Sequence, residues 1–137
     1  MMTSNEINVV KAFIAAINRH NPSEMYDLMT EDHTLIDSGG RVETGREKMT
    51  VGWEEYFRMF PDFEIQIESI LGDKTLVAAF GSASRTYNGK RGLVPENRIQ
   101  MPAAWKAMVA NSKIKHWQLY TDWTEGGKII EEDETSG

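Results

Sequence analysis

The sequence predicts an α+β fold in which helices precede a set of long antiparallel strands. Three observations carry this prediction. Helix-capping signals, each followed by apolar residues at three- and four-residue steps, occupy about the first sixty residues. Residues 62–123 then read almost continuously as strands separated by short turns. The length of 137 residues suits one compact domain, and there is no internal repeat.

Two helices open the chain. Thr3 begins a capping-box pattern that is completed by Glu6, and the apolar residues that follow lie on one helical stripe up to about His20. Asn21 and Pro22 then supply a cap and a first residue for a short second helix. Two helices are therefore expected before any strand.

A short strand and a third helix follow. Residues 32–37 alternate so that His33, Leu35 and Asp37 share one face of a strand. After a Ser-Gly-Gly turn, a capping box at residues 44–47 starts a helix that ends before Pro61. The apolar face of this helix is the most aromatic in the chain and carries Met49, Trp53, Tyr56, Phe57 and Phe60.

The second half of the chain is predicted to be strands and a tail. The expected strands are 62–71, 75–87, 98–110 and 113–123, with an Asn-Ser hairpin turn between the last two. The final residues are rich in glutamate and too charged to bury much surface. We therefore expect one domain over residues 1–125 and an acidic, flexible tail over residues 126–137.

Composition excludes several classes of function. Fifteen Lys and Arg against 21 Asp and Glu give a net charge of −6, which disfavours binding to nucleic acid. No stretch approaches the roughly 20 apolar residues that a membrane span needs, so we expect no membrane association. The absence of cysteine removes disulfides and thiolate ligands and fits a cytoplasmic location.

The last predicted strand has two unlike faces. Gln118, Tyr120 and Asp122 lie on the polar face, which we expect either to line a cavity or to be exposed to solvent. Trp117, Leu119 and Trp123 lie on the other face, which would meet a helix or a second subunit. A monomer would leave this aromatic surface wet, so the pattern predicts a homodimer through the sheet.

Asp37 and Asp122 are candidates for a general base whose pKa is raised by an aromatic pocket, or else for turn or capping residues. His33 would orient Asp37 or shuttle a proton, or would be a structural histidine. The three histidines, His20, His33 and His116, lack the spacing of a metal site, and no glycine-rich phosphate loop is present.

Aromatic residues are abundant, with four Trp, four Tyr and five Phe. Each ring alone is best read as core. Gathered with a few polar groups, however, they would form the mainly apolar pocket typical of a small-molecule site. The residues expected to bind substrate are Trp53, Tyr56, Phe60, Trp105, Gln118 and Tyr120.

Residues 32–40 with 44–47, and later 101–107 with 114–122, resemble the SnoaL-like branch of the nuclear transport factor 2-like superfamily. The resemblance extends from residue 5 to about 123. It implies a cone-shaped, curved, mostly antiparallel sheet packed on three helices of the N-terminal half, enclosing a pocket, and commonly a homodimer. In the cyclases an acid near the end of the last strand, similar to Asp122, acts as acid/base. In the ketosteroid isomerases the base is similar to Asp37, but Phe13 and Ile14 stand where their oxyanion-stabilising Tyr is expected.

These observations predict a small-molecule-binding protein and, as its activity, cofactor-free cyclase or isomerase chemistry on an apolar or carbonyl-containing molecule, with no metal. Asp122 would remove a proton beside the carbonyl, and His33 or Gln118 would hydrogen-bond the developing enolate. One alternative is a non-catalytic binding or dimerising scaffold. Another is a dehydratase or hydrolase in which His33 assists Asp37 or Asp122.

Overall fold

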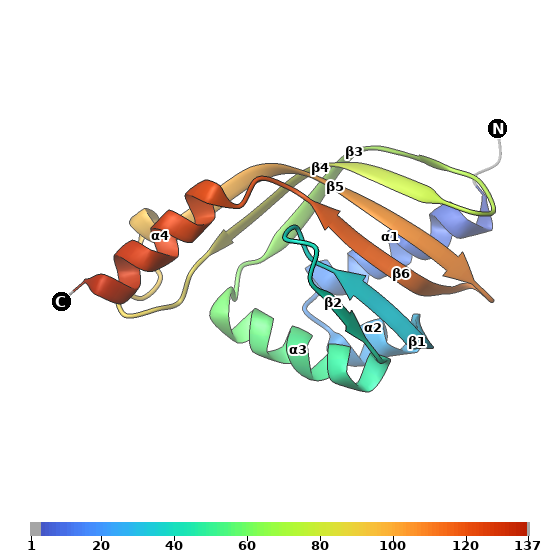
Figure 1. Cartoon of the computed structure of the whole chain (residues 1–137), viewed down its shortest axis with the longest axis horizontal. Helices are drawn as coiled ribbons and strands as arrows, with labels where there is room; N and C mark the ends of the chain where they lie inside the picture. The colour runs from blue at the N-terminus through green and yellow to red at the C-terminus, as the bar shows by residue number, and fades with distance from the viewer. Residues whose placement is uncertain (1–3, 137) are drawn as a thin grey trace.

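The computed structural model describes residues 4–136 and has the predicted α+β architecture, with a curved sheet covered on one face by helices (Figure 1). The sheet is mixed, with strand order β2-β1-β6-β5-β4-β3, and only the β1–β6 pair is parallel. The strands are β1 (Met29–Ile36), β2 (Val42–Thr44), β3 (Glu64–Gly72), β4 (Val77–Thr86), β5 (Arg98–Ala110) and β6 (Lys113–Tyr120).

Three helices lie on the same side of this sheet in Figure 1. They are α1 (Asn5–Asn18), α2 (Pro22–Asp27) and α3 (Arg46–Met59). The Asn18 side chain fastens α1 to β3, because its amide donates to the Ile65 carbonyl at 2.9 Å and its oxygen accepts from the Ile65 N–H at 2.8 Å. His20 stacks on Phe57 of α3 at 4.2 Å between ring centroids. These contacts hold the helices over the concave face of the sheet.

The helix starts differ in detail from the sequence prediction. Thr3 lies outside the described residues, and Ser4 caps α1 by accepting from the Ile7 N–H at 3.1 Å. Asn21 caps α2 as predicted. Gly45 precedes α3 with φ 105°, a backbone conformation that favours glycine, and makes no side-chain cap. The short strand β2 was not predicted, because three residues carry too little pattern.

The acidic tail that the sequence predicts to be flexible forms helix α4 (Thr124–Thr135). A short 3-10 turn of the β4–β5 loop, η1 (Pro95–Asn97), packs beside this helix. Asp133 is fully buried there. Its carboxylate accepts from the backbone N–H groups of Lys90 and Arg91 at 2.7 Å and from the Asn97 amide at 3.0 Å. These bonds attach α4 to the β4–β5 loop, a contact over some forty residues of sequence.

Candidate functional site

A cavity of about 300 Å³ lies between the concave face of the sheet and α3. Most of its lining is aromatic or aliphatic, from both layers of the fold, and Gly52 of α3 completes the wall. The apolar lining residues are Leu35, Ile36, Met49, Trp53, Tyr56, Phe63, Ile65, Trp105, Trp117 and Leu119. The polar ones are Asp37, Arg41, Glu43 and Arg85.

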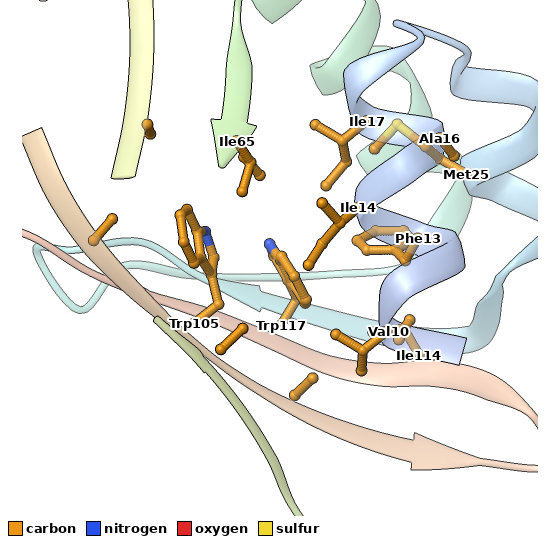
Figure 2. Packing of buried hydrophobic residues seen from close by; sticks show 14 of the residues in the cluster. Val10, Phe13, Ile14, Ala16, Ile17, Met25, Ile65, Trp105, Ile114 and Trp117 are labelled. Atoms are coloured by element: carbon orange, nitrogen blue, oxygen red, sulfur yellow. The ribbon is translucent and has the colours of Figure 1, made fainter. Parts of the chain in front are cut away.

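Two tryptophans from neighbouring strands form the sheet side of the cavity. Trp105 of β5 and Trp117 of β6 lie with their ring centroids 6.5 Å apart, and Phe13 of α1 meets the Trp117 ring edge-on at 5.1 Å. Figure 2 shows both indoles standing up from the sheet towards Ile65 and the apolar side chains of α1. Both indoles therefore contribute aromatic surface to the cavity lining.

Arg85 on β4 is the most unusual lining residue, because its side chain is a cation and the residue is only 4% exposed. A guanidinium nitrogen donates a hydrogen bond to the Tyr56 hydroxyl of α3. Among residues 4–136, Arg85 has no carboxylate partner within ion-pair distance, and its Nε is buried without a hydrogen bond. Burial lowers the pKa of Arg85, and the neighbouring Tyr56 opposes this effect.

Four aromatic rings surround the Arg85 guanidinium. Its central carbon lies 4.6 Å from the ring centroid of Phe63, 5.1 Å from that of Trp123, 5.8 Å from that of Phe60 and 5.9 Å from that of Tyr56. Aromatic faces attract a cation, so these rings partly replace the water that burial removes. They supply no hydrogen-bond acceptor other than the Tyr56 hydroxyl.

The acidic groups of the cavity belong to the hairpin formed by β1 and β2. Asp37 and Glu43 are half-buried there, and Arg41 between them is exposed. One oxygen of Asp37 accepts from the backbone N–H groups of Gly39 and Arg41, both at 2.9 Å. The carboxylate therefore closes the turn with Oδ1, and only Oδ2 lacks a hydrogen bond within the described chain.

Four of the predicted site residues line this cavity together: Asp37, Trp53, Tyr56 and Trp105. Five predicted site residues do not line it: Asp122, His33, Phe60, Gln118 and Tyr120. Of the two alternatives for the polar face of the last strand, lining of this cavity does not hold, and Tyr120 and Asp122 are exposed to solvent. Of the two alternatives for its aromatic face, contact with a helix describes Trp117, which packs against Phe13 of α1.

The aromatic face of β6 is turned inward and its polar face outward, because burying indole rings stabilises the fold more than burying polar side chains would. Trp117 is 3% exposed and points inward, whereas Tyr120 is 48% exposed on the outer face. A bulge between Ile114 and His116 also breaks the alternation, so that Ile114 and Trp117 are both buried although they are three residues apart. Gln118 lies beside His116, whose Nε2 is 3.3 Å from the Gln118 Oε1.

His33 is fully buried and does not reach the cavity. Its Nδ1 is 2.8 Å from the Ile114 carbonyl, which assigns the ring proton to Nδ1, and Nε2 has no partner within the described chain. Burial lowers the pKa of His33, although the bond to Ile114 opposes this. The histidine joins β1 to β6 and cannot assist Asp37.

Asp122 is exposed and precedes α4. Its Oδ1 accepts from the Thr124 N–H at 2.9 Å, and hydrogen bonding to Thr124 lowers the pKa of this carboxyl. The N-cap of α4 is Trp123, so the turn alternative considered from the sequence describes Asp122, whose side chain bonds the N–H two residues on. Phe60 is buried between Tyr56 and Tyr87 and packs behind the cavity wall rather than in it.

Sequence reasoning missed Arg85, although the chain carries a signal for it. On β4, Arg85 has the same parity as the buried residues Val77, Ala79 and Ala83. An arginine on the inward face of a strand is rare unless it is paired. The alternation of small apolar residues along this strand therefore indicates an inward-facing cation at Arg85.

Within residues 4–136 no three His, Asp or Glu side chains are arranged to hold a metal ion. None of the helices in the described part of the chain has the length and apolar character needed to cross a membrane.

Solved structures with this fold include proteins of several activities. A protein from Shewanella putrefaciens, provisionally assigned as a SnoaL-like polyketide cyclase, is 14% identical, with 94% of this chain and 87% of that chain covered and a TM-score of 0.80. An LEH-like epoxide hydrolase from M. tuberculosis is 17% identical, with 96% and 93% covered and a TM-score of 0.78. At these identities the similarity establishes the fold alone.

A third structure, from Catenulispora acidiphila, has a ketosteroid isomerase-like fold and was solved in complex with trimethylamine. It is 22% identical, with 82% of this chain and 83% of that chain covered and a TM-score of 0.71. No curated protein matches the chain significantly. The model of the SnoaL-like domain matches residues 10–117, which include every lining residue of the cavity except Leu119. The chain belongs to the SnoaL-like domain family.

Proposed function

We propose that this protein binds a small, planar, mainly apolar molecule in the cavity between the sheet and α3. The observation that carries the proposal is the lining itself: aromatic and aliphatic side chains with a few polar groups around about 300 Å³. That volume lies at the lower end of small-molecule sites. The trimethylamine complex of the C. acidiphila structure supports small-molecule binding within this fold.

Gly52 contributes to the cavity wall. It lies inside α3, where glycine is roughly 1 kcal/mol less favourable than alanine. A Cβ at this position would meet no atom within 4 Å, so packing does not require a glycine. Gly52 is exposed and lines the cavity, so a large side chain there would lie at the cavity opening.

Gly52 also provides the test. The probe is 2-naphthamide, a neutral planar molecule, titrated by calorimetry into the parent protein and two variants. Gly52→Ala leaves space in the cavity wall and should bind the probe as the parent does. Gly52→Phe places a ring there and should weaken binding by about tenfold or more. Equal binding by both variants, or no binding to the parent, would contradict the proposal.

A second candidate function is proton transfer on a carbonyl compound, with Asp37 as the base. It is favoured because Asp37 lines the same cavity as Trp53, whose indole N–H is buried without a partner in the described chain. The Oδ2 of Asp37 would take a proton from the carbon beside the carbonyl. The electron pair of that C–H bond would move to the carbonyl oxygen, and Trp53 would donate to the resulting enolate.

Proton transfer is tested by exchange of the C1 protons of 2-tetralone in D₂O, followed by NMR. Asp37→Asn should abolish the exchange that the parent catalyses while leaving 2-naphthamide binding unchanged. Asp122→Asn should exchange as fast as the parent, because Asp122 lies outside the cavity. Undiminished exchange by Asp37→Asn would exclude Asp37 as the base. If the parent protein catalyses no exchange, the proton-transfer function is overturned and only the binding function remains.

We further propose a homodimer through the outer face of the sheet. Phe80, Ala104 and Tyr120 are paired across β4, β5 and β6, and Phe80 is 45% exposed. Phe80→Glu should produce monomers in analytical ultracentrifugation at micromolar concentration. Leu93→Glu, on an exposed loop residue, serves as the control and should sediment as the parent does. A monomeric parent protein would overturn this proposal.

A further inference from the structure

We propose that the ligand of the cavity carries a single carboxylate and that Arg85 and Tyr56 bind it. This inference rests on the proposed binding function and adds the chemical class of the ligand. It begins from a charge that the protein itself does not balance.

The guanidinium of Arg85 is removed from water without an ionic partner in residues 4–136. An unpaired buried charge is unfavourable, and proteins normally pair such a group. Asp62 is the nearest source of negative charge that acts on it, but it is exposed and forms its 3.9 Å ion pair with Arg98 instead. The free protein thus holds a cation that a bound anion would compensate.

The hydrogen-bond geometry indicates where the anion binds. A guanidinium has five N–H donors, all in the plane of the group. Within the described chain only one donor is used, by the Tyr56 hydroxyl. Phe63 and Trp123 lie close enough to act through their ring faces, which attract the charge but accept no conventional hydrogen bond. Because Nε is closed off from solvent, the donors left for a ligand are the remaining N–H groups of the two terminal nitrogens.

Tyr56 adds a second donor at the same place. Because its oxygen accepts from Arg85, its own proton can be given to another acceptor. Burial raises the pKa of Tyr56, so the hydroxyl stays protonated at neutral pH even though Arg85 acts in the opposite direction. A cation and a neutral O–H therefore meet in the cavity wall beside each other.

These groups select one class of anion. The fork of N–H donors on arginine matches the two oxygens of a carboxylate. Arg85, the one buried cation among residues 4–136, balances one negative charge. On the hairpin the two carboxylates, Asp37 and Glu43, outnumber the exposed Arg41 and would repel a second. The aromatic rings of Trp53, Trp105 and Trp117 in the lining suit an aromatic or unsaturated body. The inferred ligand class is a planar, apolar monocarboxylic acid.

The experiment compares 2-naphthoate with 2-naphthamide, which has nearly the same shape and no charge. In calorimetric titrations the parent protein should bind the carboxylate about tenfold or more tightly than the amide. Arg85→Met should lose this preference while still binding the amide. Arg58→Gln removes the same charge from an exposed position on α3 outside the cavity lining and should keep the preference.

Stability separates a ligand-binding role of Arg85 from a structural one. Because the charge is unpaired in the free protein, Arg85→Met should melt at the parent temperature or above. If Arg85→Met does not fold, the test moves to Arg85→Lys, which keeps the positive charge but lacks the paired N–H donors of a guanidinium. A reduced preference of Arg85→Lys for 2-naphthoate then supports the inference. An unchanged preference shows that Arg85 is structural and overturns it.

The outcomes distinguish the two proposals. If the amide and the carboxylate bind the parent equally, the cavity binds small molecules but the carboxylate inference is overturned. If Arg85→Met or Arg85→Lys retains the full preference, Arg85 is not the group that recognises the anion. If neither probe binds the parent, the binding function itself fails, and the inference fails with it.

Discussion

Tyr56 and Arg85 join the two layers of the fold through one hydrogen bond, in which the guanidinium of β4 donates to the phenol oxygen of α3. The bond lies in the wall of the cavity, where both residues are lining residues. The same two side chains therefore link α3 to the sheet and supply polar groups to the cavity.

Tyr56→Phe tests this bond. The variant keeps the ring but leaves one more N–H of Arg85 without a partner, so we expect the free energy of unfolding to fall by about 1–3 kcal/mol. Urea denaturation measures the change. Tyr26→Phe is the matched control, because the Tyr26 hydroxyl bonds Glu47 on the exposed surface and should matter little. Similar losses in the two variants would contradict a special role for the buried bond.

We expect the Asp133 carboxylate to hold α4 against the β4–β5 loop. Asp133→Asn replaces one accepting oxygen by a donor opposite three N–H donors, so we expect the melting temperature to fall by about 5 °C or more. Glu132→Gln, one residue earlier and exposed, removes the same charge and should have little effect. Calorimetry of both variants measures the difference, and equal melting temperatures would exclude the attachment.

The Asp133 bonds also predict a pH dependence. Desolvation raises the pKa of Asp133, but hydrogen bonds from Asn97, Arg91 and Lys90 and the charge of Arg91 outweigh it, so the pKa lies below its ordinary value. The stabilisation is therefore present above the unfolded pKa of about 3.9 and is lost as the pH falls through the folded value. The difference in melting temperature between the parent and Asp133→Asn should be constant from pH 7 to 5 and shrink only below about pH 4. A difference that shrinks between pH 7 and 5 would be inconsistent with this.

His33 predicts a second pH effect, in a higher range. Because burial lowers its pKa, the unfolded chain takes up a proton first as the pH falls below about 6.5. Its contribution to stability is complete above that value and declines by at most about 1.4 kcal/mol per pH unit below it. Urea denaturation at pH 7.5 and 5.5 should show a smaller decline for His33→Phe than for the parent. Equal declines in the parent and in His33→Phe would contradict this prediction.

Asp122 is expected to act on α4 and not on the ligand. An Asn side chain accepts the same turn hydrogen bond as Asp, so Asp122→Asn should melt as the parent does, whereas Asp122→Ala should melt a few degrees lower because the Thr124 N–H loses its acceptor. Binding of 2-naphthamide should be the same in both. Loss of 2-naphthamide binding in either variant would show that Asp122 contributes to ligand binding and would contradict this prediction.

Much of the fold was accessible from the sequence, because caps and periodicity act locally. The Asn21-Pro22 start of α2 and the bounds of β5 were predicted correctly. Leu35 and Asp37 line the same cavity, as their predicted shared face requires, whereas His33, next to a register shift between Met29 and Thr34, does not reach it. The α4 helix was missed because its stabilisation comes from Asp133 bonds to a loop more than forty residues away.

The candidate site was predicted only where one element presents it. Trp53 and Tyr56 follow from the periodicity of α3, and Asp37 follows from that of β1. Arg85 acquires its significance from Tyr56, Phe63 and Trp123, which reach it from other elements. Which face of β6 is buried could not be read from alternation, because a bulge interrupts the strand.

The sequence by itself therefore determined the α+β class, the family and the order of the α-helices and strands from α1 to β6 other than β2, because these depend on local patterns along the chain. The tertiary structure decided which polar groups are shut away from water. It buried Arg85 without an anion and left Asp122 in solvent. Desolvation is a property of the packed layers together, and no single segment of the chain carries it.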